Sequence, residues 1–263
     1  MKYKCLSIAG FDGSGGAGIQ ADLKTFSALG CYGMTVLTAL PVQNTRGVRN
    51  CYDISLKCIQ EQLEAIFDDI VPDSIKIGML FSSPLIKIVA DFLLENAPNI
   101  PIVLDPVMVA KSGESLLLPE AIETLKTHLI PLATIITPNL PEAYSLVGNM
   151  ASPDVLATQL LKLGSHAVLL KGGHGEGNTS EDVFLDSNNN YCLLKSERII
   201  SKNTHGTGCT LSAAICSFLA LENSLLESCK LSKDYLLKAI IASKVNSVGN
   251  GHGPVHHFHK WWT

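Results

Sequence analysis

A glycine-rich turn in the last third of the chain has the residue types that bind phosphoryl oxygens. In "NTHGTGCTLSAAI", residues 203–215, Gly206, Thr207 and Gly208 stand directly before small and apolar residues typical of a packed helix. Free backbone N–H groups at a helix start, together with the positive end of the helix dipole, favour phosphoryl oxygens. Cys209 falls in the first turn, where the same field favours a thiolate that can accept a proton from a substrate hydroxyl. The alternative is an inert core thiol, the usual role of a cysteine among small residues.

A second glycine cluster, near the N-terminus, has the spacing of a dinucleotide-binding loop. In "SIAGFDGSGGAGIQADL", Gly13, Gly15 and Gly18 spell G-x-G-x-x-G. That fold also needs an acidic residue about 20 residues further on to bind the ribose hydroxyls. The next strand-like run leads instead into "PVQNTRG", where Gln43 and Asn44 offer amides that suit a neutral ring better than a ribose. We therefore interpret the glycines as backbone that approaches a small ligand closely, in preference to a dinucleotide site or a flexible turn.

Composition and charge narrow the class of protein. The 263 residues are 46% hydrophobic and 17% charged, which favours one packed α/β domain over a disordered chain. The net charge is −4 and there is no basic run, so nothing indicates binding to nucleic acid or to an anionic membrane. The apolar runs are too short for a signal peptide or a transmembrane helix, and we expect a cytoplasmic protein. The eight cysteines include no C-x-x-C pair, which argues against a zinc site or a redox dithiol.

Strand-like and helix-like segments alternate along the chain. Amphipathic stretches such as "SLKCIQEQLEAIFDDI" repeat apolar residues at helical spacing, and Ser83 before Pro84 and Ser152 before Pro153 are typical of helix starts. The alternation predicts a single α/β domain over residues 1–263, with a mostly parallel central sheet and helices on both faces. Ligands of such a sheet bind at the carboxyl ends of its strands. Strand-like runs occupy residues 35–39, 75–77, 102–104, 134–136 and 167–170.

Six segments, in one order, resemble a known enzyme family. They are "SGGAGIQADLKTFSALGCYGMTVLTAL", "QNT", "DPVMVAKSG", "TPNLPEA", "LLKGGH" and "NTHGTGCTLSAAI". Together they resemble the hydroxymethylpyrimidine and phosphomethylpyrimidine kinases of thiamin biosynthesis, members of the ribokinase-like superfamily close to the pyridoxal kinases. The likeness runs from about residue 4 to the final "GHGPVHHFH". It implies an ATP- and Mg²⁺-dependent, homodimeric kinase that phosphorylates 4-amino-5-hydroxymethyl-2-methylpyrimidine and then its monophosphate. The Walker A pattern of P-loop enzymes does not occur in the sequence.

The resemblance also implies roles for individual residues. Cys209 would be the general base, beside an anion hole framed by Gly206 and Gly208. Gln43 would hydrogen-bond the aminopyrimidine ring. The other substrate contacts would be Gly10, Asp12, Val42, Met79 and Val107. The nucleotide and metal site would comprise Lys171, Asn139 and Thr207 for the nucleotide, with Asp105 and Glu142 for Mg²⁺. Taken singly, Asp105 before Pro106 also fits a strand-ending turn, and Glu142 also fits a helix start.

Other interpretations stay open at this level. Pyridoxal is also a flat heteroaromatic ring with a hydroxymethyl group, so a pyridoxal kinase or a dual-substrate kinase is the nearest alternative. A non-catalytic nucleotide sensor would keep the glycine loops without needing a base. The sequence departs from the family pattern at two places: relatives often have proline in place of Gly13, and small residues in place of Pro41-Val42. The histidines of the C-terminal segment are weak evidence for a metal, and we assign none to His252, His256, His257 and His259.

Overall fold

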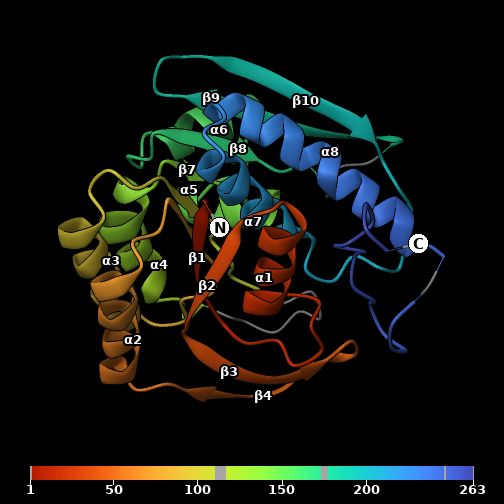
Figure 1. Cartoon of the computed structure of the whole chain (residues 1–263). Helices are drawn as coiled ribbons and strands as arrows, with labels where there is room; N and C mark the ends of the chain where they lie inside the picture. The colour runs from red at the N-terminus through yellow and green to blue at the C-terminus, as the bar shows by residue number, and fades with distance from the viewer. Residues whose placement is uncertain (1, 110–116, 173–176, 246, 263) are drawn as a thin grey trace.

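The central sheet is mostly parallel, as the alternation of segments predicts. The computed structural model describes residues 2–109, 117–172, 177–245 and 247–262, and within them eight strands form one sheet in the order β10-β9-β8-β7-β6-β5-β1-β2 (Figure 1). β9 runs antiparallel to both β8 and β10, whereas the neighbours from β8 to β2 are parallel. The strands are β1 (Lys4–Ala9), β2 (Tyr32–Leu37), β5 (Ser74–Ile77), β6 (Ile102–Leu104), β7 (Ile135–Ile136), β8 (Ala167–Leu170), β9 (Thr179–Asp186) and β10 (Tyr191–Glu197).

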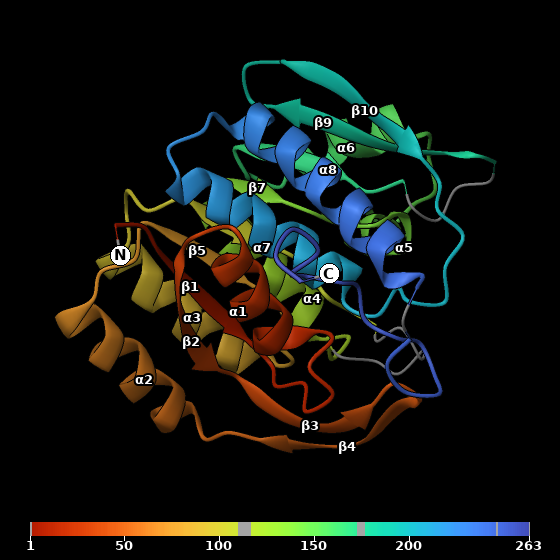
Figure 2. The same ribbon diagram turned by 45° about the vertical axis from the view of Figure 1, so that its right-hand side comes forward.

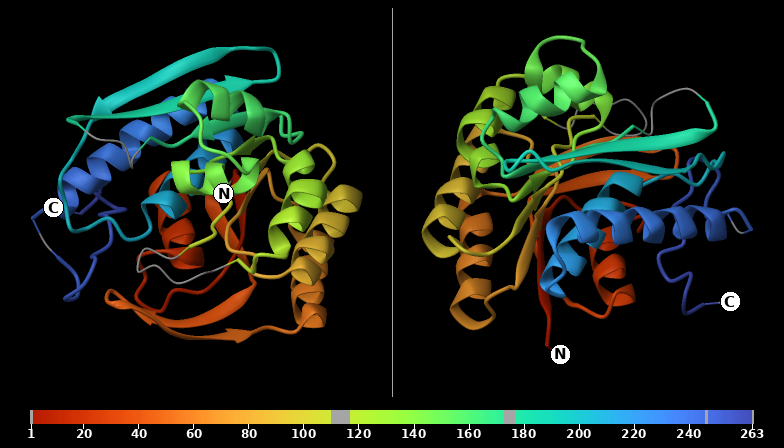
Figure 3. Two further views of the ribbon diagram at one scale, coloured as in Figure 1. Left: turned by 180° about the vertical axis from the view of Figure 1, so that it is seen from behind. Right: turned by 90° about the horizontal axis from the view of Figure 1, so that it is seen from above.

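Helices cover both faces of the sheet, as Figure 3 shows from above. The first group of helices packs on one face: α1 (Gly18–Ala28), α7 (Thr207–Ala220) and α8 (Leu225–Ser243). The second group packs on the other: α2 (Leu56–Asp69), α3 (Ser83–Asn96), α4 (Ala121–Thr124), α5 (Leu140–Val147) and α6 (Pro153–Leu161), with the short helices η1 (Leu125–Leu129) and η2 (Ile130–Leu132) after α4. The sheet is therefore the middle of three layers.

Side chains alternate along the buried strands, so each strand contributes apolar side chains to both faces of the sheet. In β6, Ile102 and Leu104 belong to the apolar cluster under α2 to α6, while Val103 belongs to the cluster under α1, α7 and α8. In β8, Val168 belongs to the cluster under α2 to α6 and Leu169 to the cluster under α1, α7 and α8. Successive side chains of a strand point to opposite faces, so a strand covered on both sides must be apolar throughout. This explains why these strands are continuous apolar runs in the sequence.

The predicted start of α6 agrees with the structure, whereas the predicted start of α3 and the predicted strand over residues 35–39 differ from it. Ser152 is the N-cap of α6 and Pro153 its first residue, as predicted. In α3, however, the N-cap is Ser82, one residue before the predicted Ser83. The predicted run 35–39 is divided between two strands, because β2 ends at Leu37 and β3 begins at Ala39. The two elements then belong to different sheets.

A separate β-hairpin lies beside the central sheet. It consists of β3 (Ala39–Asn44) and β4 (Gly47–Asp53), which pair antiparallel with each other in a two-stranded sheet (Figure 2). The register shifts between Val42 and Gln43, the local irregularity of a β-bulge. Apolar side chains on its outer surface are exposed, among them Leu40, Val42 and Tyr52. The hairpin therefore presents an uncovered apolar face within the described part of the chain.

The C-terminal segment packs against the layer formed by α1, α7 and α8. The Tyr235 hydroxyl on α8 donates to the backbone oxygen of His257 at 2.7 Å, and the Thr210 Oγ1 on α7 lies 3.1 Å from the His257 Nε2. The Trp261 indole donates to the backbone oxygen of Ala28 at the end of α1. Burial, followed by the nearby Lys24 charge, lowers the pKa of His257 to about 3. His257 is thus held neutral inside the fold.

Stability should fall with acid because of this histidine. An unfolded histidine binds its proton near pH 6.5, whereas the folded His257 does so only near pH 3. The unfolded state therefore binds more protons between these values, and the free energy of unfolding decreases as the pH falls through this window. We expect the wild-type protein to lose about 2 kcal/mol more than a His257→Gln variant between about pH 6.5 and pH 5. Urea unfolding of both proteins at the two pH values measures this, and equal losses would contradict the assignment.

Candidate active site

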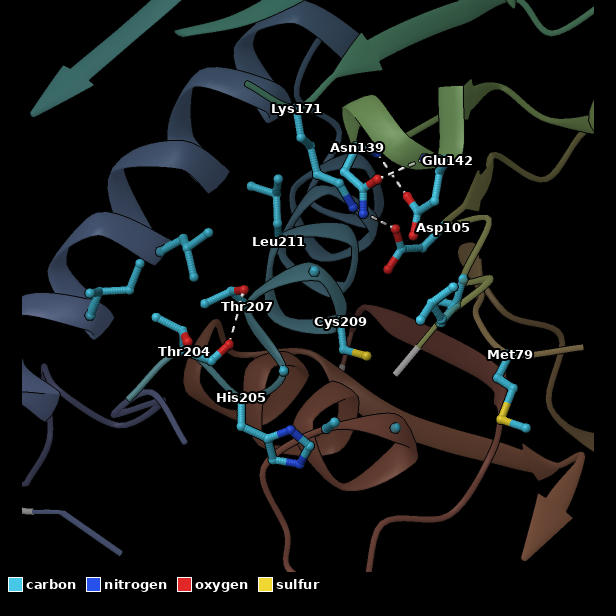
Figure 4. A pocket seen from close by; sticks show the side chains of 18 of the residues that line it. Met79, Asp105, Asn139, Glu142, Lys171, Thr204, His205, Thr207, Cys209 and Leu211 are labelled. Atoms are coloured by element: carbon cyan, nitrogen blue, oxygen red, sulfur yellow. Dashed lines mark hydrogen bonds and ion pairs between the residues drawn. The ribbon is translucent and has the colours of Figure 1, made fainter. Parts of the chain in front are cut away.

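A cavity of about 660 Å³ opens at the carboxyl ends of the parallel strands. Its walls come from the loops after β1, β5, β6, β7 and β8, from the β3–β4 hairpin, and from α7 and α8 (Figure 4). This is the edge of an open parallel sheet where ligand sites are expected. Most residues singled out from the sequence line it: Gly10, Gln43, Met79, Asp105, Val107, Asn139, Glu142, Lys171, Gly206, Thr207, Gly208 and Cys209.

The start of α7 requires glycine for two different reasons. Gly206 is the N-cap and has a φ of +73°, in the left-handed region that favours glycine. A side chain there would also overlap the backbone oxygen of Gly16 in the N-terminal glycine loop. At Gly208 a Cβ would lie 3.3 Å from the Asp105 Oδ2 and 3.5 Å from the Lys171 Nζ. The turn is therefore packed against both the glycine loop and the charged groups of the site, with its backbone N–H groups at the helix start.

Cys209 lies in the first turn of α7 and points into the cavity (Figure 4). Burial raises the pKa of its thiol to about 11, although Lys76 acts in the opposite direction. Asp22 and Asp105 add to the increase, and a backbone N–H from Gly18 partly offsets it. The expectation that the helix start favours a thiolate is therefore not met, because the loss of hydration on burial raises the pKa of this thiol.

A charged cluster forms the other side of the cavity. The Lys171 Nζ at the end of β8 lies 2.9 Å from the Asp105 Oδ1, and the Thr137 hydroxyl donates to the same oxygen at 3.0 Å. The Asp105 side chain is almost fully buried. Although burial opposes its ionisation, Lys171 and then Lys76 hold the pKa of Asp105 below its usual value. Asp105 is therefore an ionised carboxylate at the edge of the cavity.

Asn139 and Glu142 are fixed by a capping box at the start of α5. The Asn139 Oδ1 accepts from the Glu142 N–H at 2.9 Å, and the Glu142 Oε2 accepts from the Asn139 N–H at 2.8 Å. Burial raises the pKa of Glu142 to about 7; Lys171 lowers it, and the Asp105 carboxylate contributes to the increase. The helix-start interpretation of Glu142 is thus correct, and the same side chain also lines the cavity.

Asp12 and Val42 do not line the cavity, contrary to the sequence prediction. The Asp12 carboxylate is used inside the glycine loop, where it accepts from the Ser14 and Ala17 backbone N–H groups and pairs with the His205 Nε2 at 2.8 Å. Burial opposes ionisation, but hydrogen bonds from His205 and Ser14 hold the pKa of Asp12 at about 2. Its role is to shape the loop and join it to the turn before α7.

Val42 points away because neighbours along a strand alternate. Pro41 and Gln43 on either side of it line the cavity, whereas Val42 is 45% exposed on the outer face of the hairpin. The Gln43 Nε2 donates to the backbone oxygen of Phe11 at 3.3 Å. Of the predicted ring contacts in β3, only the Gln43 amide is in place to face a ligand.

Two groups of lining residues were not singled out from the sequence. Lys76 lies on β5 within an apolar run, and a lysine in a buried strand was itself a visible signal. The other group forms the end of the cavity beneath α8, where Lys233 pairs with Asp182 at 2.6 Å beside apolar side chains. Those apolar residues are Ile199, Leu211, Leu236, Leu237 and Ile240. They come from segments far apart in the sequence, so no local motif marks them.

Comparison with known proteins places this geometry in a family. The model of the phosphomethylpyrimidine kinase family matches residues 12–256. The hydroxymethylpyrimidine/phosphomethylpyrimidine kinase of Rhizobium meliloti is 47% identical, covering 100% of this chain and 99% of that protein. A crystal structure of phosphomethylpyrimidine kinase from Clostridium difficile has a TM-score of 0.79 at 46% identity, over 91% of this chain and 100% of that one.

A pyridoxal kinase is similar in structure as well. The ADP complex of Bacillus subtilis pyridoxal kinase has a TM-score of 0.89 at 37% identity and covers 98% of both chains. The ribokinase-like fold expected from the resemblance is thereby confirmed. In the described residues, no helix is long and apolar enough to cross a membrane. With a family model that covers most of its length and relatives of nearly half-identical sequence, the chain belongs to the phosphomethylpyrimidine kinase family.

Proposed function

We propose that this protein uses ATP to phosphorylate the hydroxymethyl group of 4-amino-5-hydroxymethyl-2-methylpyrimidine, and then phosphorylates that product to the diphosphate, in thiamin biosynthesis. The observation that carries the proposal is the position of Cys209 within one cavity. Gln43 and Met79 line this cavity, as do the charged groups of Lys171 and Asp105. A ring alcohol bound near Gln43 would thus share the site with the groups that handle phosphate.

The chain's own residues account for most of the chemistry. The Cys209 thiolate accepts the proton of the substrate hydroxyl, and the alkoxide oxygen forms a bond to the γ-phosphorus as the bond to the ADP oxygen breaks. The backbone N–H groups of Thr207 and Gly208 at the start of α7, together with Lys171, stabilise the charge on the transferred group. In the second step, the acceptor oxygen belongs to the phosphate of the monophosphate.

The carboxylates of Asp105 and Glu142 suit a magnesium ion. Mg²⁺ is usually held by one or two carboxylates together with water and substrate phosphates. The two side chains lie near enough that Asp105 raises the pKa of Glu142, a like-charge repulsion that a divalent cation would relieve. Asn139 would support the site through its capping box with Glu142 and its bridge to Lys171. When bound, the ion would neutralise charge on the ATP phosphates.

We also propose that residues 1–263 form one kinase domain that acts in the cytoplasm as a homodimer. The exposed apolar face of the β3–β4 hairpin supports the dimer, since uncovered apolar strands are usually paired or covered in the native assembly. Two-fold dimers are also the commonest closed assembly. Light scattering at micromolar concentration tests this, and a monomer would contradict it.

Pyridoxal is the second candidate substrate, because a pyridoxal kinase has a TM-score of 0.89 to this chain. Side-by-side turnover of the two alcohols with ATP separates the candidates. We expect kcat/KM for the pyrimidine alcohol to exceed that for pyridoxal by at least about tenfold, the discrimination given by roughly 1.4 kcal/mol of differential binding. A preference for pyridoxal would overturn the substrate assignment. Nucleotide binding without turnover of either alcohol would favour the sensor alternative.

Replacing Gln43 by alanine should weaken binding of the pyrimidine alcohol by about 1–3 kcal/mol, the cost of leaving a buried polar partner unpaired. The affinity for ATP should change little, because the charged cluster of Lys171 and Asp105 lies elsewhere in the cavity. Calorimetric titration with each ligand measures both effects. Val42→Ala is the matched control, since Val42 is adjacent in β3 but exposed on the other face. Equal losses in the two variants, or equal losses for the two ligands, would place Gln43 outside the substrate pocket.

A further inference from the structure

Lys76 is a fully buried lysine in the wall of the active-site cavity. It lies on β5, and its side chain has no solvent-exposed surface. The Lys76 Nζ donates to the Asp22 Oδ2 at 2.8 Å, and the Ser7 hydroxyl donates to the same oxygen at 2.5 Å. Asp22, on α1, is also completely buried. An ion pair thus lies beneath the site, linking β1, α1 and β5.

Stability alone does not explain this pair. Taking two charges out of water costs several kcal/mol per ion, and replacing a buried pair by apolar residues is often neutral or stabilising. The pair is also incompletely satisfied within the described residues: the Asp22 Oδ1 has no hydrogen-bond partner, and the three-donor Lys76 ammonium has one acceptor. A buried charge with unused donors at the wall of a cavity is in place to act on a neighbouring group.

The backbone makes room for the Lys76 ammonium at this position. A Cβ on Gly78, just after β5, would lie 2.7 Å from the Lys76 Nζ and 3.1 Å from the Ala9 Cβ. A larger residue there would meet the ammonium group. Although burial opposes the charge, neighbouring acidic groups led by Asp22 raise the pKa of Lys76, so the group stays protonated.

Cys209 lines the same cavity as Lys76 and lies in the first turn of α7. The charged or titratable groups that interact with the Cys209 sulfur are Lys76 on β5, Asp22 on α1 and Asp105 after β6. Lys76 favours the thiolate, whereas the two carboxylates oppose it, and the Lys76 contribution is the largest of the three. A buried positive charge offsets part of the cost of negative charge on a nearby sulfur that has lost part of its hydration.

We propose that Lys76 is a positioning residue whose buried ammonium group stabilises negative charge on the Cys209 sulfur. The inference rests on the proposed function for its role in catalysis, where the sulfur takes the proton of the substrate hydroxyl. Its effect on the thiol, however, can be measured in the ligand-free enzyme.

The test measures the reactivity of Cys209 in two variants. Lys76→Met removes the positive charge but leaves the Asp22 carboxylate buried without its partner, so this variant is expected to lose stability. The double variant Lys76→Met/Asp22→Asn removes both charges and keeps an amide near Ser7. Alkylation by iodoacetamide from about pH 7 to pH 10, followed by mass spectrometry of the Cys209 peptide, reports the thiolate fraction. We expect alkylation of Cys209 to be about tenfold slower in Lys76→Met, the effect of one unit of pKa. In the double variant the slowing should be smaller but still present, because the Asp22 carboxylate that opposes the thiolate is removed as well and the Lys76 contribution is the larger of the two.

A matched control separates this effect from the loss of any buried ion pair. The pair of Lys233 and Asp182, at 2.6 Å, is also largely buried, with side chains 11% and 7% exposed, beneath the α8 end of the same cavity. Lys233→Met/Asp182→Asn should leave the alkylation rate of Cys209 unchanged. Wild-type reactivity of Cys209 in the folded Lys76→Met/Asp22→Asn variant would overturn the proposal, as would equal slowing in the control.

Steady-state kinetics then connect the thiol to catalysis. In each variant kcat for the pyrimidine alcohol should fall by the same factor as the alkylation rate of Cys209 while the KM for ATP is unchanged, because the lost charge acts through Cys209. A wild-type enzyme that phosphorylates neither ring alcohol would overturn the proposed function, while slowed alkylation in the variants would still support the action of Lys76 on the thiol. The two failures are therefore distinguishable.

Discussion

Replacing Cys209 by alanine is expected to lower kcat by about 10²–10⁴-fold, the range for loss of a general base, with little change in substrate affinity. The sulfur at the start of α7 is the proposed proton acceptor, while the backbone N–H groups and Lys171 remain in place. Cys209→Asp should keep more activity than Cys209→Ala, because a carboxylate also accepts a proton. Release of ADP in a coupled assay measures kcat for all three proteins.

The pH dependence adds a second readout for the same residue. Because the pKa of the free Cys209 thiol is raised to about 11, kcat/KM of the wild-type enzyme should rise by about tenfold per unit between about pH 7 and pH 10. Cys209→Asp should lack this rise, since a carboxylate is already ionised there. Near-normal kcat in a folded Cys209→Ala enzyme would instead make Cys209 a structural cysteine. In that case Cys209→Asp should lower the melting temperature, because it buries a charge.

The parallel part of the sheet could be predicted because its strands are buried on both faces. Ile102 to Leu104 and Ala167 to Leu170 are short apolar runs bounded by turn residues, and the structure places β6 and β8 over the same residues. The edge strand β10 was not predicted for the opposite reason. β10 has exposed residues such as Tyr191 and Lys195 at intervals, and it therefore lacks a continuous apolar signal.

The loops that form the candidate site could be predicted from the sequence, but the directions in which their side chains point could not. The motifs gave the loops after β6, β7 and β8 and the start of α7, and these do meet in one cavity. Which way a side chain points within a motif depends on contacts that the motif does not contain. Asp12 turns into its own loop because Ser14, Ala17 and the distant His205 supply its partners. Val42 faces outward because the hairpin sets the alternation of β3.

Interactions between charges that are far apart in the sequence were the hardest feature of the site to predict. The partner of Lys76 is Asp22, 54 residues away in the sequence, and only the fold brings the two together. The Cys209 pKa is likewise a balance between burial and charges on β5, α1 and the loop after β6. A helix start by itself predicted a thiolate, whereas burial raises the pKa of this thiol. Residue types therefore indicated the chemistry of Cys209, whereas its protonation needed the structure.

Lys171→Met should lower kcat by about 10²–10³-fold, the usual cost of removing one group that stabilises charge in the transition state. It should also lower the free energy of unfolding by about 3 kcal/mol, because the buried Asp105 carboxylate loses its 2.9 Å partner. Urea unfolding and ADP-release kinetics measure the two effects separately. Lys195→Met is the matched control. The ion pair of Lys195 with Glu181 is exposed, so its loss should lower the free energy of unfolding by less than about 1 kcal/mol.

A double variant separates the two roles of Lys171. Lys171→Met/Asp105→Asn removes the unpaired carboxylate and should recover most of the lost stability, because an amide is cheaper to bury than a charge. Activity should not return, since the cation that faces the transferred phosphoryl group and the proposed magnesium carboxylate are both absent. Recovery of activity together with stability would show that Lys171 serves only to neutralise Asp105. Stability restored without activity would instead show that these two charges serve phosphoryl transfer and not only each other.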